Sequence, residues 1–147
     1  MMPAALTLTV LFLLGVSGSS FPSHVTLSAT FVPPAKAGAN AHVAVTLTPR
    51  DADVRVNEEP APRLKLDPDE AVLADKQPPA RRSSAFDPQN ARYLDPALPV
   101  HFPVAVKPTA SRGKHTVKAA VTYFYCSKRE GWCRKGTDEV EFPVDVR

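Results

Sequence analysis

One stretch decides the fold: Val121-Thr122-Tyr123-Phe124-Tyr125-Cys126-Ser127-Lys128-Arg129-Glu130-Gly131-Trp132-Cys133. It contains both cysteines of the chain, its single tryptophan and two of its three tyrosines. Apolar residues occupy alternate positions from Val117 to Tyr125, and again from Val140 to Val146. This period of two is typical of a strand with one buried face. The sequence therefore predicts two strands joined as a hairpin, with a cysteine at each rim of the loop.

Further short alternating segments lie upstream of this hairpin. The chain has 16 prolines against six glycines, and prolines interrupt helices and central strands. Pro103 lies within one of the segments and indicates an edge strand or a bulge. The expected strands cover residues 25–31, 41–48, 54–57 and 100–106, with weaker candidates at 64–66 and 71–73.

Such strands are not stable singly, because each has one apolar face to bury. Two sheets packed face to face bury those faces against each other. The sequence therefore predicts an all-β fold, an immunoglobulin-like β-sandwich with a cysteine-bearing C-terminal hairpin. A β-barrel is the second choice.

The N-terminus has the pattern of an export signal. Residues 1–20 carry no charged side chain, and an apolar run at 4–16 precedes the small residues 17–20. A run of about 13 residues is too short to span a bilayer and matches the core of a signal peptide. We therefore expect a signal peptide at 1–20, one domain at 21–147 and a periplasmic or secreted location. No stable membrane span is expected after signal removal.

Charge and motifs exclude several classes of function. The net charge is only +3, and no run of Lys and Arg exceeds two residues, which argues against a nucleic-acid partner. No Gly-rich phosphate loop and no Gly-x-Ser-x-Gly elbow occurs in the sequence. The two cysteines and four histidines lack the close pairing of a zinc site. We therefore expect no metal and no cofactor.

The cysteine pair, Cys126 and Cys133, is the strongest candidate site. In an exported chain, two cysteines form one intramolecular bridge. Basic residues lie near both cysteines, at 128–129 and 134–135, and cationic neighbours stabilise a reactive thiolate, whereas Glu130 opposes this. Closing the eight-residue loop contributes only about 2.5 kcal/mol of stability. Two alternatives stay open, an exchanging redox couple and a structural staple.

Several segments resemble a known family, the N-terminal periplasmic domain of the thiol:disulfide interchange protein DsbD. They are Val54-Arg55-Val56-Asn57, Leu64-Lys65-Leu66, Leu98-Pro99-Val100, Gly113-Lys114-His115-Thr116-Val117-Lys118, Val121-Thr122-Tyr123 and the cysteine pair. The resemblance implies an immunoglobulin-like sandwich whose cysteines exchange electrons with thioredoxin-like or other redox partner proteins, a reaction of the protein-disulfide reductase type. The alternative is a non-catalytic protein-binding module with a structural disulfide.

The resemblance also implies shielding of the cysteines by an aromatic cap loop. Phe86 lies in the comparable loop, before the strand predicted at 100–106. Tyr125 and Trp132 are further candidates, because their rings flank the cysteines in the sequence and can cover the sulfurs or offer an apolar face for docking. Basic residues lie near both cysteines, so the sequence does not indicate which sulfur is attacked first.

Overall fold

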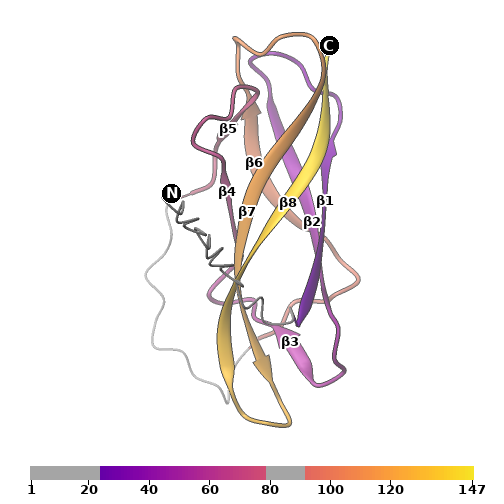
Figure 1. Cartoon of the computed structure of the whole chain (residues 1–147), viewed down its shortest axis with the longest axis vertical. Coiled ribbons are helices and arrows are strands. Elements are labelled where there is room, and N and C mark those ends of the chain that lie inside the picture. The colour runs from indigo at the N-terminus through magenta and orange to yellow at the C-terminus, as the bar shows by residue number, and fades with distance from the viewer. Residues whose placement is uncertain (1–23, 79–91) are drawn as a thin grey trace, which may run out of the picture.

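The computed structural model describes residues 24–78 and 92–147 (Figure 1). Within these residues the chain forms eight strands and no helix, and thus no helix that could cross a membrane. The strands are β1 (Val25–Val32), β2 (Asn40–Pro49), β3 (Val54–Val56), β4 (Arg63–Leu66), β5 (Leu73–Asp75), β6 (Val100–Val106), β7 (Gly113–Ser127) and β8 (Cys133–Val146). The predicted signal peptide at 1–20 and Phe86 lie outside the described residues.

The strands form two antiparallel sheets, which confirms the predicted all-β sandwich and its cysteine-bearing C-terminal hairpin. The first sheet has the order β1-β2-β6-β5. In the second, β8 pairs along one side of β7, while β3 and β4 pair with successive parts of its other side. Figure 1 shows the β7–β8 hairpin running the length of the molecule, with its tip near β3 and far from the C-terminus.

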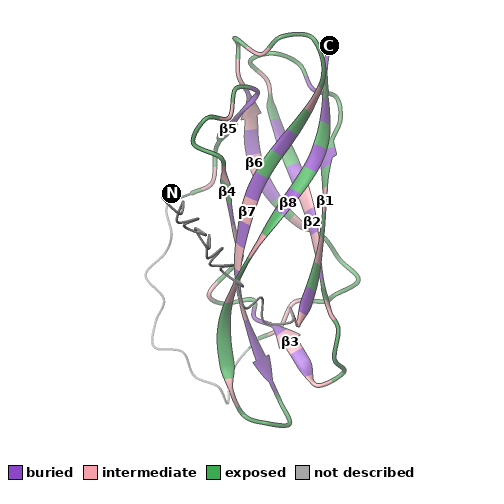
Figure 2. Cartoon of the chain, in the orientation of Figure 1, coloured by how far each residue is buried: buried purple, intermediate pink, exposed green. Residues whose placement is uncertain are grey.

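The core lies between the sheets and follows the alternation of the strands. From Val117 to Tyr125 of β7 and from Val140 to Val146 of β8, buried positions alternate with half-buried or exposed ones, as the coloured bands in Figure 2 show. The residues at the centre of the core are fully enclosed and come from both sheets. They include Val43, Val45, Val104, Val106, Val117 and Val121, each 0% exposed.

Strand β6 corrects one prediction, since Pro103 indicated an edge strand or a bulge. The structure places β6 between β2 and β5. The carbonyl of Pro103 accepts a hydrogen bond from the N–H of Lys76 at 3.3 Å, just past the end of β5 at Asp75. Because the N–H and C=O of one strand residue face the same neighbour, the bond that this proline cannot donate falls at the end of the ladder. An internal strand therefore tolerates the proline.

Candidate functional site

The tip of the β7–β8 hairpin brings the two cysteines together. Cys126 and Cys133 lie opposite each other in the register and form a disulfide with an S–S distance of 2.08 Å. The turn is closed by the N–H of Gly131 donating to the carbonyl of Ser127, and by the N–H of Ser127 donating to that of Trp132, both at 2.9 Å. Gly131 has a φ of 71°, which favours glycine. The bridge therefore closes a tight loop at one end of the sandwich.

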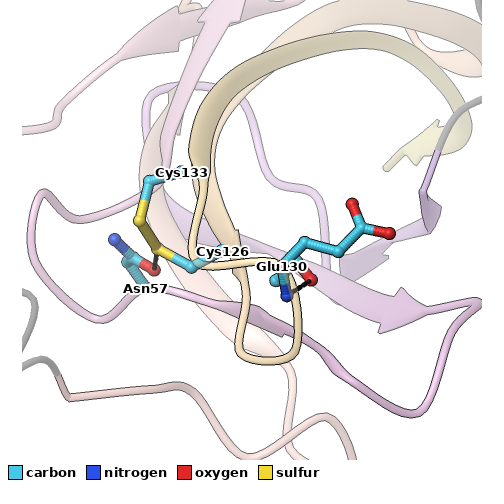
Figure 3. Close-up of a disulfide and its surroundings, with 5 residues drawn as sticks. Asn57, Cys126, Glu130 and Cys133 are labelled. Atoms are coloured by element: carbon cyan, nitrogen blue, oxygen red, sulfur yellow. Dashed lines mark hydrogen bonds between the residues drawn. A yellow bond between two sulfur atoms is a disulfide. The ribbon is translucent and has the colours of Figure 1, made fainter.

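The two sulfurs have different surroundings. Cys126 is only 4% exposed, because β3 pairs alongside it, whereas Cys133 is exposed. The side chain of Asn57, itself 2% exposed, places its Oδ1 3.3 Å from the Sγ of Cys126 (Figure 3). In the disulfide this sulfur carries no hydrogen, but in the reduced form its S–H has an acceptor in place. The geometry thus gives a buried cysteine whose sulfur has a polar partner and a second cysteine that is exposed as a residue.

A carboxylate fastens the hairpin tip to the turn before β3. The hydroxyl of Ser127 donates to Oδ2 of Asp53 at 2.6 Å and accepts from the N–H of Glu130 at 3.1 Å. The hydrogen bond from Ser127 lowers the pKa of Asp53 against the opposing effect of burial. The charges of Arg129 and His24 also lower this pKa. The loop between the cysteines is therefore anchored on the side facing β3.

An aromatic cluster also supports the tip. Tyr125 is 9% exposed, and its ring meets that of Trp132 edge-on with the centroids 5.8 Å apart. His24 contacts both rings, at 5.8 Å from Tyr125 and 5.5 Å from Trp132. The indole N–H of Trp132 donates to Oε2 of Glu130 at 2.5 Å. The structure thus brings Tyr125 and Trp132 together, with Tyr125 inside the sandwich and Trp132 half-buried beside the disulfide.

A cavity of about 350 Å³ opens beside the disulfide, and both cysteines and Trp132 line it. Tyr93, Lys128, Ser127 and Gly131 complete its lining, with Nζ of Lys128 5.3 Å from the centroid of the Tyr93 ring. The guanidinium of Arg134 lies 4.3 Å from the centroid of the Trp132 ring. The exposed Cys133 therefore lies at a small pocket that has Lys128 in its wall, and Arg134 lies over the ring of Trp132, another lining residue.

Several residues of the site were not found by sequence reasoning. Asn57, Asp53 and Tyr93 come from segments remote from the cysteines in the chain, and no spacing rule connects them to residues 126–133. Only β3 gave a signal, because its alternation predicted a strand at 54–57. That signal did not reveal its pairing with β7, which places Asn57 at the sulfur.

In comparisons with known proteins, no protein-family model and no curated protein matches this chain. The resemblance to the DsbD N-terminal domain therefore stays a prediction.

Proposed function

We propose that this protein is an exported thiol-disulfide exchange domain, which passes electrons between partner proteins through the Cys126–Cys133 couple. The observation that carries the proposal is the unequal exposure of the two cysteines. Cys133 is exposed beside a pocket, while Cys126 is 4% exposed with a polar acceptor at hand. A bridge of this kind has one sulfur that a partner can reach and one that can leave.

The exchange runs through a mixed disulfide. A partner thiolate attacks Sγ of Cys133, and the new S–S bond forms as the Cys126–Cys133 bond breaks. Cys126 leaves as a thiolate, takes a proton from solvent and then donates its S–H to Oδ1 of Asn57. A second partner thiolate attacks the partner's sulfur in the mixed disulfide and releases Cys133. Two electrons have then moved to this protein, and its dithiol returns them to a client disulfide by the reverse steps.

The test is the redox equilibrium of the mature domain against glutathione, read by thiol alkylation and mass. We expect a midpoint potential near or above about −250 mV, because exchanging disulfides are more oxidising than structural ones. With Cys126→Ser, the remaining Cys133 should trap a mixed disulfide with a thioredoxin-like partner. With Cys133→Ser, trapping should be much weaker because Cys126 is buried. Equal trapping by both variants argues against Cys133 as the entry point.

The second candidate is a non-catalytic β-sandwich module that binds a protein partner and uses the disulfide as a staple. The anchoring of the tip through Asp53 and Ser127 favours this reading, because a rigid loop suits a static clip. A midpoint far below about −300 mV, with a bridge inert to a thioredoxin-like partner, supports the staple and rejects exchange.

The proposed export is consistent with the disulfide, since such bonds persist in oxidising compartments. N-terminal sequencing of the protein recovered from periplasm or medium tests it, and a mature chain starting near Ser20 or Phe21 is the expected result. Recovery of the chain only in the cytosol with residues 1–20 intact contradicts export.

A further inference from the structure

We propose that the pocket beside the disulfide selects partner segments in which acidic side chains flank the reacting cysteine. This inference rests on the proposed exchange function and names the kind of partner that the site recognises. It is carried by the charges around the pocket, their lack of acidic partners and the size of the cavity.

The hairpin tip is strongly basic. Residues 126–135 contain four basic side chains and one acidic side chain, Glu130. Arg129 is neutralised, because its guanidinium lies 3.8 Å from a carboxylate oxygen of Asp53 and 3.7 Å from one of Glu130. Within the part of the chain that the structure describes, Lys128, Arg134 and Lys135 form no ion pair, and Lys135 lines a different cavity. Two positive charges at the pocket are therefore left for a partner.

These two charges are held in place by aromatic rings. Lys128 stacks on Tyr93 in the wall of the cavity, and Arg134 stacks on Trp132, which also lines it. The face of an aromatic ring attracts a cation, so each charged group has a preferred position before any partner arrives. The planar guanidinium of Arg134 also presents paired N–H donors that match a carboxylate. One cation, Lys128, thus lies in the wall of the pocket, and a second, Arg134, lies over the ring of a lining residue, Trp132.

The size of the cavity indicates what occupies it. A volume of about 350 Å³ lies at the lower end of the range for ligand pockets, enough for a few side chains of an extended segment. The occupant must also bring a sulfur to Cys133, at the edge of the same cavity. An extended peptide segment with Asp or Glu beside its cysteine meets both requirements. Its carboxylates would lie within about 10 Å of the two cations, where opposite charges raise the rate of encounter.

The test compares three blocked cysteine peptides of equal length, in which the residues flanking cysteine are Glu, Gln or Lys. Each reduces the oxidised protein at about 20 mM and about 0.5 M salt, and the fluorescence of Trp132, the single tryptophan, reports the reaction. Rates are expressed per thiolate, because acidic neighbours change the thiol pKa of the peptide. At low salt we expect the Glu peptide to react on the order of 10-fold faster than the Gln peptide, and this advantage to vanish at high salt.

Two double variants locate the effect. In Lys128→Gln/Arg134→Gln, the ratio of the Glu-peptide rate to the Gln-peptide rate should fall close to one. The matched control, Lys36→Gln/Lys114→Gln, removes two charges near the opposite end of the sandwich and should keep the full ratio. An equal loss in both variants attributes the preference to net charge and overturns the pocket as its source.

The remaining outcomes separate this inference from the proposed function. If all three peptides react at the same rate at low salt, exchange stands and the preference for acidic partners is refuted. If none of them reacts with the disulfide, the exchange function itself fails. Glutathione, a small thiol with two carboxylates, is run alongside, and a rate equal to that of the Glu peptide overturns recognition of an extended segment.

Discussion

Substitution of Gly136 in β8 tests the side-chain packing within the β7–β8 hairpin that bears the disulfide. It lies directly opposite Tyr123 of β7, a side chain that is 2% exposed and hydrogen-bonded to Oδ2 of Asp138 at 2.5 Å. A Cβ added to Gly136 would lie 2.6 Å from Cζ, 2.8 Å from Cε2 and 2.9 Å from the hydroxyl oxygen of Tyr123. Because these atoms belong to a rigid and enclosed ring, Gly136→Ala must displace the ring.

The cost of this displacement has two parts. Overpacking a closed core costs about 1–3 kcal/mol, and loss of the hydrogen bond to a carboxylate costs about 1.5–3 kcal/mol. Replacing glycine by alanine in a strand offsets part of this cost, because it raises the free energy of unfolding by about 0.5–1 kcal/mol. We therefore expect Gly136→Ala to lower the free energy of unfolding by about 1.5–5.5 kcal/mol, measured by urea unfolding with the disulfide intact.

A double-mutant cycle supplies the control. In a Tyr123→Val background the ring is absent, so Gly136→Ala should cost less than about 0.5 kcal/mol and the coupling should account for most of the penalty. A penalty below about 0.5 kcal/mol in the unaltered chain, or an equal penalty in both backgrounds, refutes the reasoning.

Three further predictions concern acid stability, redox potential and the core. Because the hydrogen bond from Ser127 lowers the pKa of Asp53 below 3.8, this carboxylate stabilises the fold above that pH, and the contribution is lost as the pH falls through the folded pKa. Asp53→Asn should weaken the fall in unfolding free energy between about pH 5 and pH 2, and an unchanged pH dependence contradicts this. Asn57→Leu removes the hydrogen-bond acceptor of the reduced Cys126 thiol, and we expect it to lower the midpoint potential by about 10–20 mV in a glutathione titration. A rise in the midpoint potential contradicts a role of Asn57 in stabilising the reduced form. Val121→Ala opens a cavity at a fully buried position and should cost about 2 kcal/mol in urea unfolding, against less than about 0.5 kcal/mol for Thr116→Ala on the exposed face of the same strand.

Most strands follow from the sequence because alternation is a local property. The predicted segments 25–31, 41–48 and 100–106 agree closely with β1, β2 and β6. The short strand expected at 71–73 is found instead at Leu73–Asp75, since its limits are set by pairing with β6. The prediction of an edge strand or bulge at Pro103 was wrong because it also depended on strand pairing. A proline shows which backbone hydrogen bond is missing, but only the neighbouring strand shows whether that bond is needed.

By itself the sequence determined the strand pattern, the all-β class and the placement of one cysteine at each rim of the last hairpin, because these depend on residues close together in the chain. Only the tertiary structure decided that Cys126 is buried and Cys133 exposed. Pairing of β3 with β7 brings Asn57 to a sulfur 69 residues away, and packing places Lys128 over Tyr93. Such contacts arise from the register between remote strands, which no local spacing encodes.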